Sequence, residues 1–146
     1  MKLRSPSAAG AALFLACLAV NPSSSQTAGD AQDIRGFFSG QTMLVTYRNG
    51  GPVYGTHYIL YVAFCSSGTY FTRGESSRHT VLDNEERHPI NDRGRWDVAS
   101  LGGQAVLRYL SVSGQSNAVP IRLLPNGRVM AGNGVTVIRQ GPAPCR

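Results

Sequence analysis

Histidine and carboxylate side chains are the groups of this 146-residue chain that could bind a metal ion or move a proton. Of the three histidines, His79 and His88 lie in a polar segment that also contains Asp83, Glu85 and Glu86. Imidazole and carboxylate groups are ligands that Zn²⁺ accepts. The spacing of these residues matches no recognised ligand pattern, so we expect neither a metal site nor any other cofactor.

Nucleophilic catalysis needs a serine or cysteine beside a base that a third group orients. The serines cluster in predicted turns, and the sequence contains no Gly-x-Ser-x-Gly motif, phosphate-binding loop or dinucleotide fingerprint. Glu85 and Glu86 are adjacent, so on a strand they face opposite sides and cannot act together on one bond. We therefore expect a protein without catalytic residues, which is not an enzyme.

Arginine supplies nearly all of the positive charge of the chain, whose formal net charge is +6. Arg108, Arg122, Arg128 and Arg139 lie on or beside predicted strands of the carboxyl half. On one face they would suit an anionic surface, a glycan or a small carboxylate. The alternative is that they are outward residues of a half-exposed sheet. Nucleic acid is not an expected partner, because aromatic residues are not interleaved with these arginines.

The first 25 residues have the pattern of a cleavable signal peptide. Lys2 and Arg4 precede an apolar run from Ala8 to Val20, and cleavage is expected after Ser25. The run is about thirteen residues long, whereas a transmembrane helix needs roughly 20. We expect no transmembrane span and a periplasmic or secreted protein.

The cysteines raise two further expectations. Reading Phe14 to Cys17 as a lipidation box gives the alternative of a protein that is lipid-anchored through Cys17. Cys65 and Cys145 form an even pair, which in an oxidising compartment predicts a disulfide. Closing this loop of roughly 80 residues stabilises the fold by about 4.5 kcal/mol on the chain-entropy model. Two unpaired buried thiols are the alternative.

Short apolar runs with a period of two follow one another from residue 41, separated by turns rich in glycine, proline and asparagine. The strongest run, Thr56 to Cys65, has apolar residues on both faces and is expected to be covered, at least in part, on both sides. A short helix or turn from Asp33 to Gly40 precedes the strands. Seven or eight strands predict an all-β antiparallel barrel or sandwich. The expected organisation is a signal peptide over 1–25, a flexible linker over 26–32 and a single β-barrel domain over 33–146.

Residues 73–95 differ from the rest of the chain in composition. Five arginines, five acids and two histidines fall within these 23 residues, with little apolar content. We expect a polar loop that buries little and contains at most a ragged hairpin, with Arg78 to Asp83 on one arm.

Short motifs occur in a recognisable order over residues 33–130. Ser39-Gly40-Gln41-Thr42 follows the helical lead, an aromatic strand ends in Gly68-Thr69-Tyr70, and Gly94-Arg95-Trp96 forms a Gly-x-Trp sequence in mid-chain. This order resembles small exported bacterial β-barrel domains of lipocalin-like type. In true lipocalins the Gly-x-Trp sequence lies on the first strand, so their ligand residues are not carried over. The resemblance implies a lipocalin-like barrel and no particular activity.

These observations predict an exported, non-catalytic binding domain. An eight-stranded barrel has room for side chains alone or for one small ligand. We expect a small or anionic ligand, such as a small molecule or a glycan, at a barrel mouth formed by His57, Tyr61, Trp96 and Arg108. Core packing is the alternative role for the aromatic residues. The alternative function is an envelope protein-interaction or inhibitor module that acts through the 73–95 loop.

Overall fold

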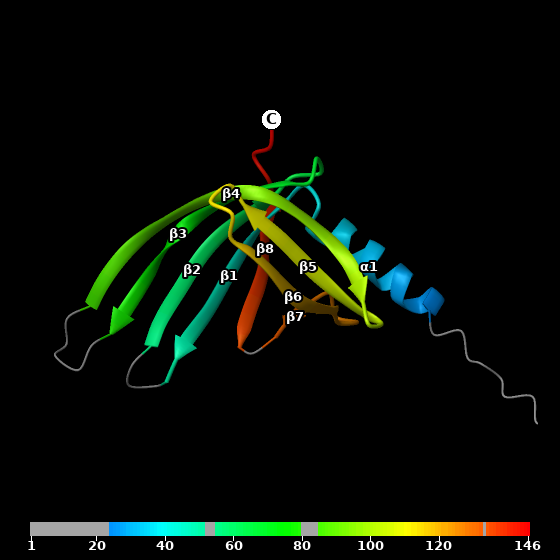
Figure 1. The fold of residues 1–146 in the computed structure, drawn as a ribbon, viewed down its shortest axis with the longest axis horizontal. Helices are drawn as coiled ribbons and strands as arrows, with labels where there is room; N and C mark the ends of the chain where they lie inside the picture. Colours follow the sequence, from blue (N-terminus) through cyan, green and yellow to red (C-terminus); the bar gives the residue numbers. More distant parts are fainter. Residues whose placement is uncertain (1–23, 52–54, 80–84, 133) are drawn as a thin grey trace, which may run out of the picture.

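The computed structural model describes residues 24–51, 55–79, 85–132 and 134–146. Across these residues, eight antiparallel strands close into one barrel in chain order, and a helix precedes them (Figure 1). This confirms the predicted all-β antiparallel barrel. The apolar run of the expected signal peptide and Cys17 lie outside the described residues. None of the described helical residues belongs to a helix that is long and apolar enough to span a membrane.

Each strand pairs with its neighbour in sequence, and the last strand pairs with the first to close the barrel. The shortest strand of the barrel wall is the seventh, which has three residues. The elements are α1 (Ser24–Phe38), β1 (Gln41–Gly50), β2 (Gly55–Phe64), β3 (Thr69–His79), β4 (Glu85–Leu101), β5 (Gln104–Ser111), β6 (Ser116–Leu123), β7 (Val129–Ala131) and β8 (Val135–Pro142).

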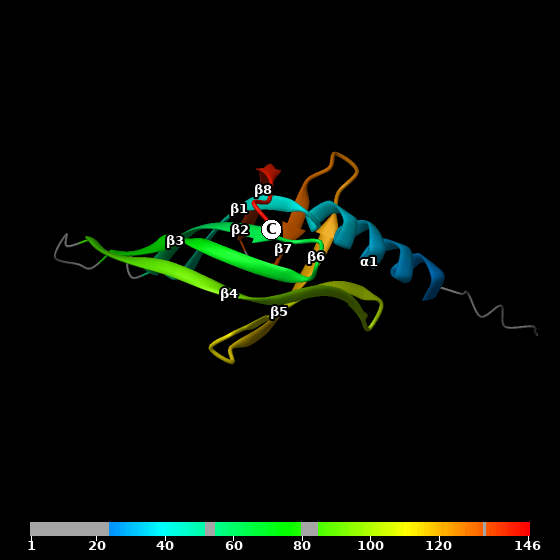
Figure 2. The same cartoon turned by 90° about the horizontal axis from the view of Figure 1, so that it is seen from above.

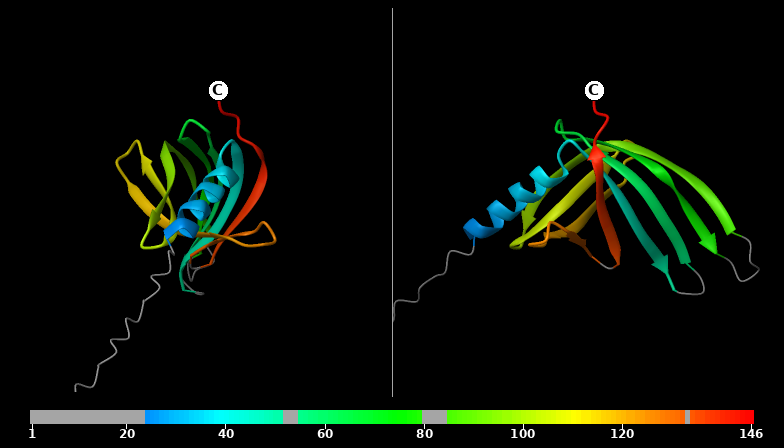
Figure 3. Two further views of the ribbon diagram at one scale, coloured as in Figure 1. Left: turned by 90° about the vertical axis from the view of Figure 1, so that its right-hand side faces the viewer. Right: turned by 180° about the vertical axis from the view of Figure 1, so that it is seen from behind.

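Helix α1 lies across one end of the barrel, as the left-hand view of Figure 3 shows. Ile34 and Phe38 point into the core and are almost completely buried. The helix ends where Gly40 adopts a φ of 70°, a conformation that favours glycine. It is longer than the predicted Asp33 to Gly40 element and includes residues 26–32, for which the sequence predicts a flexible linker. Because no proline interrupts residues 24–38, the helix extends backwards from the turn that Ile34 and Phe38 hold against the barrel.

The polar segment predicted to be a loop is a regular hairpin. Strands β3 and β4 pair without a break from Thr69 opposite Arg95 to His79 opposite Glu85. The prediction of a ragged excursion is corrected because a backbone ladder satisfies its own hydrogen bonds and needs few apolar side chains. Residues 80–84, which include part of the arm predicted from Arg78 to Asp83, lie outside the described residues.

Two glycines allow neighbouring strands to approach closely. A Cβ atom on Gly94 of β4 would lie 2.0 Å from the carbonyl oxygen of Leu110, and one on Gly74 of β3 would lie 2.1 Å from that of Ile59. No side chain fits at such distances.

Strand β4, with 17 residues, arches over the barrel (Figure 1, and from above in Figure 2).

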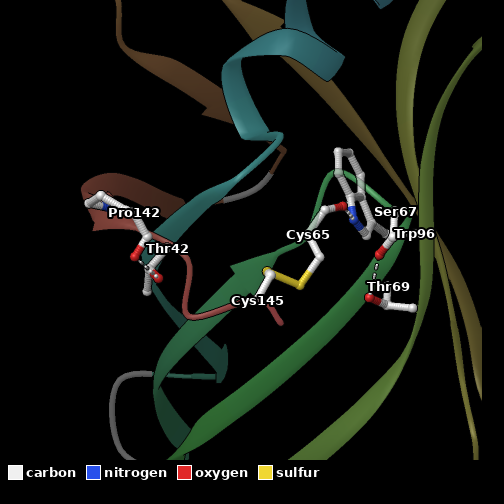
Figure 4. The surroundings of a disulfide bond; sticks show 7 residues. All are labelled: Thr42, Cys65, Ser67, Thr69, Trp96, Pro142 and Cys145. Atoms are coloured by element: carbon white, nitrogen blue, oxygen red, sulfur yellow. Dashed lines mark hydrogen bonds between the residues drawn. A yellow bond between two sulfur atoms is a disulfide. The ribbon is translucent and has the colours of Figure 1, made fainter.

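A disulfide fastens the carboxyl tail to the barrel. Cys65, at the end of β2, is bonded to Cys145, and their Cα atoms are 5.7 Å apart (Figure 4). Thr42 Oγ1 donates to the carbonyl of Pro142 at 3.3 Å on the same side of the barrel. The predicted bridge is confirmed, and it fits a protein of an oxidising compartment.

Candidate functional site

The alternation of side chains along β2 separates an inner face from an outer face. Leu60, Val62 and Phe64 line a cavity inside the barrel. Ile59 and Tyr61 have the opposite parity, and Tyr61 is 48% exposed on the outer surface. The strand is covered in part on both faces, as expected, with Val62 and Phe64 buried on the inner face and Ala63 on the outer face.

The cavity inside the barrel has a volume of about 280 Å³. Phe38 of α1 lies against it, and apolar side chains from β1, β2, β5, β6, β7 and β8 form most of its wall. Among the described residues that line it, Asp92 is the only charged one. The remaining polar side chains of the lining are Tyr47, Tyr70, Thr72, Tyr109 and Gln115.

Asp92 of β4 accepts hydrogen bonds from groups on three strands. The Tyr70 hydroxyl donates to Oδ2 at 2.7 Å, and the Ser111 hydroxyl donates to Oδ1 at 2.5 Å. The backbone N–H of Arg93 also donates to Oδ1, at 2.8 Å. Partial burial acts to raise the pKa of Asp92, but these hydrogen bonds outweigh it and hold the pKa below its ordinary value. The cavity wall therefore carries an ionised carboxylate at neutral pH.

Two tyrosines of the cavity, Tyr47 and Tyr70, have raised pKa values. Burial, then the hydrogen bond and charge of Asp92, raise the pKa of Tyr70. Burial, followed by the nearby Tyr58 and Tyr109, raises the pKa of Tyr47. Tyr47 stacks on Tyr58 with ring centroids 4.4 Å apart, and Tyr70 meets Tyr109 edge to face at 6.1 Å. The interior thus offers aromatic surfaces beside one anionic group.

The four residues predicted to form a barrel-mouth site do not come together. His57 has the outward parity of Tyr61 on β2 and lies opposite Arg48 and Ser77 in the ladders. Tyr61 lines an outer groove of about 680 Å³ together with Phe71. None of the four predicted residues lines the interior cavity.

Trp96 is a buried residue of the core. Its indole Nε1 donates to the carbonyl of Cys65 at 3.0 Å (Figure 4), and its ring meets Phe64 edge to face at 5.1 Å. The guanidinium of Arg35 lies 5.3 Å from the ring centroid. These contacts join β4 to β2 and α1, beside the disulfide.

Arg108 is held in an ion pair on the outer face. Its Nε donates to Oδ1 of Asp97 at 2.8 Å, and a second guanidinium nitrogen contacts Oδ2. The hydrogen bond from Arg108 lowers the pKa of Asp97. Arg108 and Trp96 line the same open pocket of about 930 Å³, in which Asp97 neutralises Arg108 and the other charged lining residues are Arg35 and Arg95.

Sequence reasoning missed Tyr70, Asp92 and Ser111 as site residues. The available signal was parity on β4, because Asp92 and Gly94 share an inward face with Trp96. Within the part of the chain that the structure describes, no group of three or more histidine, cysteine, aspartate or glutamate side chains could hold a metal ion. No family model matches the chain, and comparison with curated proteins and with solved structures gives no match either.

Proposed function

We propose that this protein is an exported, non-catalytic binding domain whose lipocalin-like barrel holds a small, mainly apolar molecule in its interior. The observation that carries the proposal is the cavity of about 280 Å³ with mostly apolar walls. Ligand sites in proteins are usually of this kind, apolar cavities with a few polar groups that fix orientation.

The size and chemistry of the cavity narrow the class of ligand. An apolar cavity of about 150 Å³ is enough to bind benzene, so this cavity of about 280 Å³ has room for a molecule about twice the size of benzene. The ionised Asp92 disfavours a carboxylate or phosphate inside the barrel. A neutral molecule with a hydrogen-bond donor, or an amine, fits better than the small anion that the sequence suggests.

The disulfide supports the exported part of the proposal. Bonds such as Cys65–Cys145 persist in oxidising compartments and are rare in the reducing cytosol. We infer a periplasmic or secreted protein, with attachment through a lipid on Cys17 as the alternative. Mass spectrometry of the mature protein from cells distinguishes cleavage after Ser25 from acylation of Cys17.

Binding in the interior is tested with the neutral fluorescent probe N-phenyl-1-naphthylamine. Leu60→Phe places a larger side chain in the cavity, whereas Ile59→Phe adds its bulk on the outer face of the same strand. We expect the wild-type protein and Ile59→Phe to enhance the probe's fluorescence with similar affinity. Leu60→Phe should bind at least about tenfold more weakly, the result of losing about 1.4 kcal/mol. No saturable binding to the wild-type protein, or equal binding by all three, would overturn the proposal.

A second candidate function is partner binding through the β3–β4 hairpin, because exposed apolar side chains flank its outer face. Phe71 of β3 is 48% exposed and lines the outer groove with Tyr61 and Val112. Exposed apolar side chains grouped in this way are typical of interaction sites. We expect an envelope protein that binds here to form a complex with the Leu60→Phe variant but not with the Phe71→Ser variant. Size-exclusion chromatography measures complex formation. The opposite dependence would exclude this candidate.

A further inference from the structure

Three arginines lie beside the barrel wall formed by β6, β7 and β8. Arg122 of β6, Arg128 of the β6–β7 connection and Arg139 of β8 line one open groove of about 1140 Å³. All three are exposed. None of the described residues that line the groove is acidic. The groove runs along strands that also enclose the interior cavity, and both are bordered by Ile121, Ala131, Val135 and Val137.

The positive charge of this groove is not neutralised by the protein itself. Elsewhere on the barrel, Arg87 contacts Glu75 and Glu85, and Arg108 contacts Asp97. Across the described ranges, neither Arg122 nor Arg128 makes an ion pair. Their guanidinium groups are therefore available to an external anion.

Arg139 is held in place without losing its charge. Its guanidinium donates to the carbonyl of Phe37 at 2.9 Å and lies 4.3 Å from the centroid of the Phe37 ring. Both partners are uncharged. The contact joins β8 to α1 and fixes one cation at the edge of the groove.

Large apolar side chains project outward from the same strands, whereas Arg139 has the inward parity of Val137 and reaches toward α1. Met130 of β7 is 57% exposed and lies directly opposite Arg122 in the β6–β7 ladder. Ile138 of β8, which runs at the front of the right-hand view of Figure 3, is 49% exposed. A dissolved small anion would gain nothing from Met130 and Ile138. A lipid surface offers apolar contact and negative charge together.

We propose that the groove face of β6, β7 and β8 docks the barrel on an anionic lipid surface. Met130 and Ile138 enter the interface between headgroups and acyl chains. Arg122, Arg128 and Arg139 contact the lipid phosphates, for which the guanidinium fork is well suited. This docking is independent of whether the interior cavity holds a ligand.

Co-sedimentation of the full chain with vesicles tests the proposal. We compare vesicles of phosphatidylcholine that contain about 30% phosphatidylglycerol with vesicles of pure phosphatidylcholine. The two kinds of vesicle differ in their negative surface charge. The test variant is Arg122→Gln/Arg128→Gln. The matched control is Arg48→Gln/Arg73→Gln, which removes the same charge from exposed positions on β1 and β3. Met130→Gln tests the apolar contact.

We expect the wild-type protein to bind the anionic vesicles and to be released by high salt, because salt screens exposed charges. Each basic side chain near an anionic surface contributes about 1 kcal/mol, so the test pair should lower the partition coefficient about thirtyfold. The control pair should lower it much less, and Met130→Gln should lower it several-fold. Circular dichroism and thermal melting check that each variant is folded.

Several results would overturn the proposal. Equal binding to the two kinds of vesicle would show that charge does not direct docking. An equal loss in the test and control pairs would assign the effect to net charge rather than to this face. Binding of inorganic phosphate or polyglutamate that depends on Arg122 and Arg128, without vesicle binding, would assign the groove to a soluble anion or to an acidic protein.

Discussion

The Tyr70 hydroxyl lies 2.7 Å from Oδ2 of Asp92, so that a phenol of β3 and a carboxylate of β4 are joined at the wall of the barrel cavity. Ser111 of β5 contacts the other carboxylate oxygen. One ionised group therefore links the inner faces of three consecutive strands. The same arrangement orients the one charged side chain found among the described residues of the cavity lining.

Removal of the Tyr70 hydroxyl should destabilise the fold. A hydrogen bond to a charged group contributes about 2 kcal/mol, so Tyr70→Phe should lower the free energy of unfolding by about that amount. Tyr61→Phe is the control, because Tyr61 lies on the outer surface. Urea denaturation followed by circular dichroism measures both. Equal stability of the two variants would show that the bond to Asp92 contributes little.

Stability should also depend on pH through Asp92. Its pKa is lowered in the folded state because the hydrogen bonds from Ser111, Tyr70 and the Arg93 N–H outweigh the effect of burial. A carboxyl group with a lowered folded pKa stabilises the protein above its unfolded pKa of about 3.9, and this contribution is lost as pH falls through the folded value. Asp92→Asn should be less stable at neutral pH and lose less stability between about pH 5 and 2 than the wild-type protein. Parallel urea-denaturation profiles for the two proteins over that range would contradict the assignment.

Tertiary pairing explains why the sequence predicts the barrel better than the hairpin of β3 and β4. Strand β2 is recognisable because β-branched and aromatic residues fill it. Residues 73–95 carry so many charges that their composition predicts a loop, yet they form two strands whose order comes from the ladder between them. Backbone hydrogen bonding leaves no compositional signal when the side chains it aligns are polar.

The candidate site could be predicted less well than the fold because alternation defines two faces without saying which one is inside. On β2 both faces are apolar, and the predicted site residues His57 and Tyr61 lie on the face that the structure places outside. Arg108 is predicted as a ligand contact because the sequence does not show that Asp97, on the neighbouring strand, forms an ion pair with it. Such pairings depend on register, which the sequence does not state.

The close approach of β4 to β5 should make Gly94 irreplaceable. A Cβ at this position would lie 2.0 Å from the Leu110 carbonyl oxygen, so Gly94→Ala forces two backbones apart. We expect a loss of roughly 3 kcal/mol, the upper part of the range for overpacked sites. Gly36→Ala is the contrasting variant, because nothing lies within 4 Å of its Cβ position and the residue is helical. That change should stabilise the protein by about 0.5–1 kcal/mol. Thermal melting of both variants measures the difference, and similar shifts for the two would contradict it.

The disulfide should supply a large part of the stability. Cys65 and Cys145 are separated by 80 residues. Loss of this cross-link in Cys65→Ala/Cys145→Ala should lower the free energy of unfolding by about 4.5 kcal/mol on the chain-entropy model. Urea denaturation of the oxidised protein and the double variant provides the comparison. Thiol titration of the denatured wild-type protein provides the control and should find neither Cys65 nor Cys145 free. A double variant as stable as the wild-type protein would mean that the contacts of the tail hold it without the bond.

Phe38 should contribute to stability and limit the size of the ligand. It is 1% exposed, lies at the end of α1 and lines the interior cavity. Phe38→Ala should cost about 3–5 kcal/mol and extend the cavity toward the helix. Phe37→Ala is the matched control, since its neighbouring ring lies on the outer groove beneath Arg139. If the barrel interior is the binding site, Phe38→Ala should bind probes larger than N-phenyl-1-naphthylamine that the wild-type protein and Phe37→Ala exclude. Isothermal titration at a temperature where Phe38→Ala remains folded measures this, and an unchanged size limit in that variant would place the ligand outside the cavity.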